Sequence, residues 1–166
     1  MTNYYVIDTN VFLCASGIAT HVSTDQIGTV RAWLTRFRQD GDAVLLLDSE
    51  GAPSLTKSRI LEEYQKKMTK SDVGWLAIKS KLESRNYLCY NVAFEGTAPN
   101  EYASLPDTMT RQWRDPADRK FMAVALDHVR VYPRQRCRIV NATDSDWSQY
   151  ASILRQHFIE VDQLLT

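Results

Sequence analysis

The sequence predicts an α/β fold built around a mainly parallel sheet. Short apolar runs rich in β-branched and aromatic residues alternate along the chain with helical patterns of roughly ten to fifteen residues, which is typical of such sheets. The length of 166 residues suits one domain, and 44% hydrophobic with 24% charged residues argues against disorder and fibrous repeats. In folds of this class the chemistry lies beyond the carboxyl ends of the strands.

The first half of the chain contains two expected strands, and each closes on an aspartate. The β-rich run 4–7 ends at Asp8, and the continuous apolar run 43–47 ends at Asp48. Between them, apolar residues at spacings of three and four predict an amphipathic helix over 23–39. After the second strand the same spacing predicts helices over 58–68 and 71–84.

The second half begins with an expected strand over 87–94. The following segment, 95–106, is rich in Gly, Pro, Asn and Ser, which is typical of a long loop or insertion. The remaining expected elements, in chain order, are a helix over 118–127, a short strand over 138–140, a helix over about 146–156 and a last apolar stretch over 158–161.

Charge and cysteine usage exclude several classes of protein. The 20 Lys and Arg balance 20 Asp and Glu, so the chain is not a strongly cationic module that holds nucleic acid by bulk charge. Cys14, Cys89 and Cys137 are far apart and form no C-x-x-C pair, so we expect neither a disulfide framework nor a zinc site. The first ten residues do not resemble a signal peptide, and no apolar run is long enough to span a membrane. We therefore expect a cytoplasmic protein with no membrane partner.

Carboxylates follow or flank the expected core elements in four separate segments. They are Asp8 after the first strand, Glu63 in a helix, Asp118 at a helix start, and Asp144 with Asp146 after a late strand. Crowded carboxylates repel one another when no cation is present, and Mg²⁺ and Mn²⁺ prefer such oxygen ligands. Taken singly, each acid could be a helix cap, a turn former or a surface charge. Their joint occurrence favours a metal site, supported by Thr9 and Asn10 through hydrogen bonds.

The local context of each acid resembles the PIN-domain family of metal-dependent nucleases. Residues 6–12, Val-Ile-Asp-Thr-Asn-Val-Phe, match the family's opening signature. Residues 60–64, Ile-Leu-Glu-Glu-Tyr, match its helical glutamate at Glu63, and residues 118–125 begin an apolar helix with an alanine seven residues after the aspartate. Residues 139–147 keep Asp-x-Asp-Trp but carry one extra residue after the strand, which leaves both Asp144 and Asp146 as candidates to face the metal. We favour Asp144, with Asp146 capping the last helix.

The resemblance implies a single nuclease domain over 1–166, folded as a three-layer α/β/α sandwich with a family-specific insertion around 85–114. It implies a divalent-metal-dependent endoribonuclease in which Mg²⁺ or Mn²⁺ activates water against a phosphodiester. The implied catalytic residues are Asp8, Glu63, Asp118 and Asp144, with Asp8, Asp118 and Asp144 as metal ligands. The implied supporting residues are Thr9, Asn10, Asp115, Asn141 and Asp146. Small relatives are often toxins or defence effectors, which implies an inhibitory or regulatory protein partner, and many PIN domains resemble dimers.

Basic residues concentrate around the third acid, between 111 and 138. The expected RNA-binding residues are Arg111, Arg114, Arg119, Lys120, Arg134 and Arg136. Trp113 and Tyr132 lie in the same run and are candidates for stacking on unpaired bases of RNA or single-stranded DNA. The alternative is an ordinary solvated surface, with Arg119 and Lys120 paired to nearby acids.

Two other classes of function compete with the nuclease. A non-catalytic PIN-like scaffold that binds RNA or protein would explain the altered spacing before Asp144. A phosphoacceptor regulatory domain is disfavoured, because the first strand ends in the lone Asp8 and no lysine follows a late strand at the expected place. The three histidines, His21, His128 and His157, have no catalytic context, and we expect them to be structural or exposed.

Overall fold

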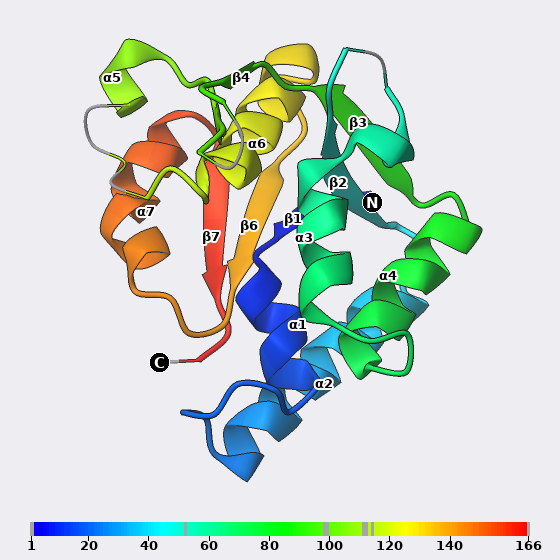
Figure 1. The fold of residues 1–166 in the computed structure, drawn as a ribbon. Coiled ribbons are helices and arrows are strands. Elements are labelled where there is room, and N and C mark those ends of the chain that lie inside the picture. The colour runs from blue at the N-terminus through cyan, green and yellow to red at the C-terminus, as the bar shows by residue number, and fades with distance from the viewer. Residues whose placement is uncertain (1, 52, 98–99, 111–112, 114, 166) are drawn as a thin grey trace.

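A five-stranded, all-parallel sheet forms the centre of the protein (Figure 1). The computed structural model describes residues 2–51, 53–97, 100–110, 113 and 115–165. The strands lie in the order β3-β2-β1-β6-β7. Their bounds are β1 Asn3–Ile7, β2 Ala43–Ser49, β3 Tyr87–Asn91, β6 Cys137–Asn141 and β7 Ile159–Gln163. The predicted α/β fold with a parallel sheet is confirmed.

Helices cover both faces of this sheet, as two adjacent tyrosines of β1 demonstrate. Tyr5 packs edge-on against Trp33 of α2 (Thr24–Gln39), whereas Tyr4 lies 4.3 Å from the ring of His128 in α6 (Arg119–Val131). Because successive side chains of a strand point to opposite faces, α2 and α6 lie on opposite sides of the sheet. The sheet between them is buried on both faces, which explains why β2 is a continuous apolar run. These three layers are consistent with the expected sandwich.

The remaining elements complete the layers. They are α1 (Thr9–Ala15), the 3₁₀ turn η1 (Leu55–Lys57), α3 (Arg59–Lys67), α4 (Val73–Glu83), a hairpin of β4 (Phe94–Glu95) and β5 (Tyr102–Ala103), the short α5 (Asp107–Thr110), and α7 (Asp146–Gln156). The sequence did not predict α1, and it left the last apolar stretch unassigned where β7 forms. The expected insertion 85–114 is only partly an addition to the central sheet. β3 belongs to that sheet, and the described residues after β3 form the added hairpin and helix. Among the described residues no helix has the length and hydropathy of a transmembrane span.

The order of the strands reverses between β1 and β6. From β1 the chain proceeds to β2 and β3 on one side, then returns to β6 and β7 on the other. Open α/β sheets bind ligands at such a reversal, because the connections leaving the two central strands diverge and open a crevice at the carboxyl edge. The amide of Asp8 donates to the carbonyl of Val140 over 2.9 Å, so the ends of β1 and β6 remain joined at this edge.

Asp48, at the carboxyl end of β2, anchors the start of α3. Its fully buried carboxylate accepts hydrogen bonds from the Ser58 hydroxyl and from the amides of Arg59 and Ile60, each at 2.8 Å. The Ser58 hydroxyl in turn accepts from the amide of Leu61, which completes the helix cap. This anchor fixes α3 beside the carboxyl edge of the sheet, where Glu63 is carried toward the end of β1.

Replacement of Asp48 by alanine should destabilise the fold. Asp48→Ala would leave a buried hydroxyl, a buried amide and a part-buried amide without their acceptor, so we expect the free energy of unfolding to fall by about 2–4 kcal/mol. Urea denaturation measures this change. Glu83→Ala, which removes an exposed carboxylate at the end of α4, is the control and should change stability by less than about 0.5 kcal/mol. Equal effects of the two variants would contradict the anchoring role.

Candidate metal centre

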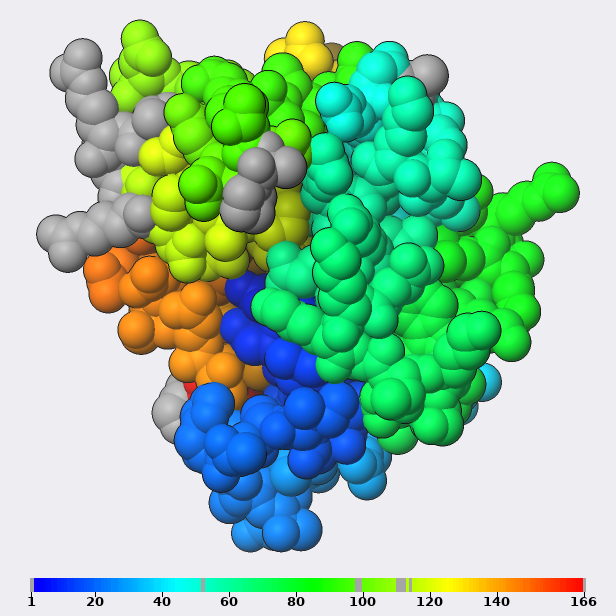
Figure 2. Space-filling view, in the orientation of Figure 1, coloured from blue at the N-terminus to red at the C-terminus, as the bar shows by residue number. Residues whose placement is uncertain are grey.

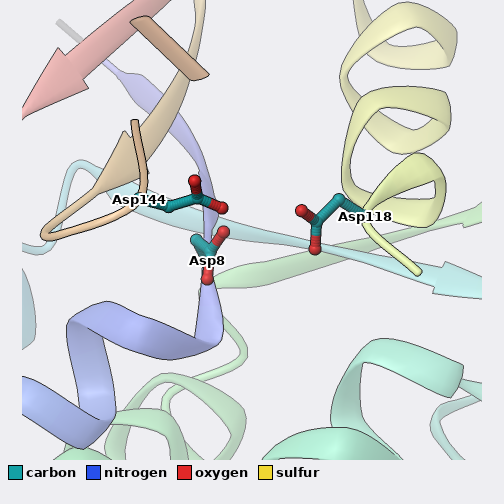
Figure 3. A group of neighbouring side chains, drawn as sticks. All are labelled: Asp8, Asp118 and Asp144. Carbon is teal, nitrogen blue, oxygen red and sulfur yellow. The ribbon is translucent and has the colours of Figure 1, made fainter. Parts of the chain in front are cut away.

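Three aspartates converge at the reversal point of the sheet (Figure 3). Asp8 follows β1, Asp144 lies in the loop after β6, and Asp118 immediately precedes α6. One carboxylate oxygen from each side chain lies within 4.8 Å of the other two. In the space-filling view, the N-terminal segment forms the floor of a hollow bordered by the segments of α3, α6 and the β6–α7 connection (Figure 2). The structure therefore brings together the three acids that we expect to be metal ligands.

Asp8 is held rigidly by two donors. Its Oδ1 accepts from the amide of Asn10 over 2.9 Å, and its Oδ2 accepts from the indole Nε1 of Trp147 over 2.6 Å. Trp147 is itself fully buried and packs against Trp113. Asp8 also occupies the N-cap position of α1. The helix-cap interpretation and the site interpretation of Asp8 are thus compatible, because the cap fixes the carboxylate that faces the other two acids.

A pair of asparagines positions the loop that carries Asp144. The side-chain amide of Asn10 donates to Oδ1 of Asn141 over 2.8 Å, and the same oxygen accepts from the amide of Asp144 over 3.1 Å. The Oδ1 of Asn10 accepts from the amide of Ala142 over 2.9 Å. Asn10 and Asn141 therefore support the site by fixing the backbone of β6 and its loop against the end of β1.

Asp146 does not occupy the position that we predict for it. The N-cap of α7 is Ser145, and Asp146 is the first residue of the helix, so the predicted capping role is wrong. The amide of Asp146 donates to Oδ1 of Asp144 over 2.8 Å. The group of converging carboxylates includes Asp144 and leaves Asp146 out. The extra residue in this segment is accommodated by the turn 142–145, which still directs Asp144 into the site.

Asp118 stands at the N-cap position of α6 without capping it. Its side chain makes no cap hydrogen bond, and it points toward the other two aspartates (Figure 3). The exposed Asp115 lies in the turn before it, where its Oδ1 accepts from the amide of Ala117 over 2.8 Å. Asp115 therefore shapes the turn and adds negative charge nearby, while Asp118 is the acid presented to the centre.

Asp8 and Asp118 both have raised pKa values. Burial, together with the charges of Asp8, Asp115 and Asp144, raises the pKa of Asp118 to about 7. Burial also raises the pKa of Asp8 to about 6, against the opposing effect of its hydrogen bonds from Asn10 and Trp147. Both shifts come first from burial, which disfavours the ionised carboxylate, and the neighbouring acids add to them. A hard divalent cation, which prefers oxygen ligands, would favour the ionised form of these carboxylates.

Glu63 is near this centre but outside it. Its Oε1 accepts from the Thr9 hydroxyl over 2.6 Å and from Lys67 over 2.9 Å, and its Oε2 pairs with Lys120 at 2.7 Å. Burial alone would raise the pKa of Glu63, but Lys120, Thr9 and Lys67 together lower it to about 2. Glu63 thus stays ionised and fully engaged with neighbouring donors. It is not one of the converging metal-ligand candidates.

The predicted RNA-binding residues that the structure describes lie at both ends of α6. Arg111 and Arg114 lie outside the described residues. Arg134 and Arg136 precede β6 at the amino edge of the sheet, and Arg136 pairs with Glu160 there. α6 separates them from Asp118 by its 13 residues, about 20 Å of helix. Their role in guiding a substrate to this centre stays a prediction.

The other members of the basic run have structural contacts. Lys120 is buried and paired with Glu63, which agrees with the local ion-pair alternative. Arg119 lies 5.0 Å from the ring centroid of Tyr102, beside the site. Trp113 is 3% exposed and packs on Trp147, so it is not available for stacking on a base, and Tyr132 lies at the far end of α6. Among the histidines, His128 is buried and His21 and His157 are exposed, as predicted.

Sequence reasoning missed two residues that shape the centre. Trp147 was recognised only as part of a motif, yet its indole donates directly to Asp8. For Lys120 the sequence predicts RNA binding or an ion pair with a nearby acid, and it does not identify the partner, Glu63. The only available signal for Trp147 was its position in Asp-x-Asp-Trp, and the chain gives no local signal that Lys120 turns inward, because its partner is far away in the sequence.

Comparisons with known proteins leave the family of this chain open. No family model, no curated protein and no solved structure matches it. The functional argument therefore depends on the geometry of the three aspartates and on the residues that hold them.

The apo protein should become more stable when Asp118 loses its charge. An unfolded aspartate has a pKa near 3.9, and the folded value for Asp118 is about 7. The unfolded chain therefore releases this proton first, and stability falls as the pH rises from about 4 to 7. With EDTA present, we expect Asp118→Asn to be about 1–3 kcal/mol more stable than the parent at pH 8, which is less than the full shift because part of the side chain faces water.

Urea denaturation at pH 8 and pH 4 measures this difference, which should vanish at pH 4, where the carboxyl of the parent is protonated. Asp146→Asn, which changes a nearby acid outside the centre, is the matched control and should show little change between the two pH values. A loss of stability in Asp118→Asn at pH 8 would show that the three charges are already balanced in the apo protein.

Proposed function

We propose that this chain is a divalent-metal-dependent nuclease that hydrolyses RNA phosphodiester bonds, a PIN-like endoribonuclease using Mg²⁺ or Mn²⁺. The observation that carries the proposal is the convergence of Asp8, Asp118 and Asp144 within 4.8 Å at the reversal point of a parallel sheet. The raised pKa values of Asp8 and Asp118 support it, because a divalent cation at this position would offset the burial and the mutual repulsion that raise them.

A bound ion would lower the pKa of a coordinated water and stabilise the departing 3′-oxygen of the phosphodiester. The protein's own residues prepare this reaction. Trp147 and the amide of Asn10 orient the Asp8 carboxylate, and the Asn10–Asn141 pair holds the Asp144 loop. Asp118 and Asp144 are only partly buried, so a phosphate could approach the three acids from solvent.

We assign Glu63 a different role from the catalytic one that the family resemblance implies. A carboxylate with a pKa of about 2 and three hydrogen-bonded donors is a poor proton acceptor near neutral pH. We therefore assign Glu63 as a positioning residue, which fixes Thr9 at the start of α1 and Lys120 at the start of α6. These are the two elements that carry Asp8 and Asp118 on their N-terminal sides.

The choice of RNA as substrate depends on the resemblance of the four acidic segments to PIN-domain nucleases. The non-catalytic scaffold loses its main support, because the altered spacing after β6 still delivers Asp144 to the centre. A role as toxin or defence effector, an inhibitory partner protein, a homodimer and a cytoplasmic location remain predictions from the sequence.

A cleavage assay tests the proposed activity. We expect the purified protein to cut single-stranded RNA with Mg²⁺ or Mn²⁺ and to lose the activity with EDTA. Asp118→Asn should reduce the rate by about 100-fold or more, because it removes a metal ligand without removing a hydrogen bond described for the folded chain. Asp146→Asn should retain the parent rate. No cleavage of RNA or single-stranded DNA with either metal, or full activity in Asp118→Asn, would refute the proposal.

A metal-binding measurement tests directly whether Asp144 or Asp146 is the metal ligand. By calorimetry, Asp144→Asn should weaken Mn²⁺ binding by about tenfold or more, while Asp146→Asn should leave it within about twofold of the parent. Binding by the parent should also weaken as the pH falls from 8 to 5, because Asp118 and Asp8 take up protons near pH 7 and 6. The opposite ranking of the two variants would move the ligand assignment to Asp146.

A further inference from the structure

A cleft of about 470 Å³ opens beside the metal centre. Its walls come from α3, from the β4–β5 hairpin and from the turn before α6. Two lining residues connect it with the centre. Ala117 directly precedes Asp118, and Glu63 holds the Thr9 hydroxyl next to Asp8. A polymer whose phosphate lies at the three aspartates could therefore extend its adjacent unit into this cleft.

The hairpin contributes two aromatic rings to the cleft, Phe94 and Tyr102. Each ring has an arginine against it: Arg59 lies 5.8 Å from the centroid of Phe94, and Arg119 lies 5.0 Å from that of Tyr102. Tyr102 is connected to the metal centre through Arg119, which contacts its ring and directly follows Asp118 in the chain. Both rings are partly exposed. An aromatic ring with an arginine beside it is a platform on which nucleobases of any sequence stack.

Each of the two arginines keeps one donor unsatisfied inside the protein. The Nε atoms of Arg59 and Arg119 are buried and have no hydrogen-bond partner among the described residues. Buried donors are normally satisfied. Because these Nε atoms are shielded from solvent, they are not available to a ligand in the cleft, and recognition there depends on the two aromatic rings and on the charged side chains that line it.

The charge of the cleft limits how much of a nucleic acid it binds. Four cationic side chains, Arg59, Lys66, Lys67 and Lys120, line it together with three glutamates. Most of these charges pair with each other, for example Lys66 with Glu62 at 2.7 Å and Arg59 with Glu101 at 2.7 Å. The excess is one positive charge, which suits a single phosphate. A groove that tracks a long backbone would be far more basic.

We propose that this cleft is a subsite for one unpaired nucleotide of single-stranded RNA, next to the phosphate that is cut. Its base stacks on Tyr102, and its phosphate faces the α3 lysines. A base in a duplex has its neighbours stacked on both faces, so the subsite selects single strands. This inference depends on the proposed nuclease function for the position of the scissile phosphate, whereas the stacking contact can be measured without cleavage.

The test uses Asp118→Asn protein in EDTA, so that no RNA is cut, and a short RNA carrying 2-aminopurine, whose fluorescence is quenched on stacking. We expect quenching with the single strand and none with the matching duplex. Tyr102→Ala should abolish the quenching and weaken binding by about tenfold, as expected for one lost stacking contact. Tyr102→Phe should bind within about twofold of the Tyr102 protein. Tyr102→Leu, which keeps apolar bulk in the hairpin, should behave like Tyr102→Ala even if the latter folds poorly.

Tyr132→Ala is the matched control, because Tyr132 is 42% exposed at the opposite end of α6 and should not affect binding. Unchanged RNA affinity and quenching in Tyr102→Leu, or equal binding of duplex and single strand, would overturn the subsite. The outcome is separable from that of the nuclease proposal. Tyr102-dependent stacking by a protein that cuts nothing would retain the subsite and reject the activity, and metal-dependent cleavage that is indifferent to Tyr102 would do the reverse.

Discussion

Three carboxylates brought within 4.8 Å of one another at the edge of the sheet are the constraint on which the other features of this protein depend. Like charges in a partly dehydrated site oppose folding, so the surrounding structure must hold each of them. Trp147 holds Asp8, the Asn10–Asn141 pair holds the loop of Asp144, and α6 directs Asp118 at the other two. Sites that sacrifice stability in this way are characteristic of functional centres in natural proteins.

The core of the fold could be predicted from the sequence because its signals are local. β2 is buried on both faces and therefore is a continuous apolar run, and α2 shows helical spacing that begins at the Ser23 cap. The three ligand candidates could be predicted for a related reason. Asp8 and Asp144 each follow a recognisable strand, and parallel strands deliver their carboxyl ends to one edge. Asp118 opens the apolar helix that packs across that sheet.

Features that depend on contacts between distant residues could not be predicted. α1 has only seven residues, too few to be stable alone, so tertiary packing decides that it forms. Lys120 pairs with Glu63 across two helices, which no local pattern indicates. Arg134 is near Asp118 in sequence, but α6 carries it to the other edge of the sheet. The cleft lined by Phe94 and Tyr102 likewise forms only when the β4–β5 hairpin packs beside α3.

A crystal structure of the protein with Mn²⁺, using the anomalous signal of the metal, tests the central claim most directly. We expect a peak among the carboxylates of Asp8, Asp118 and Asp144, about 2.0–2.3 Å from one oxygen of each, with Glu63 still paired to Lys120. Such an ion would offset the mutual repulsion of the three carboxylates. A structure with no anomalous peak at these residues, or with Mn²⁺ bound by other acids while the three aspartates remain free, would contradict the assignment.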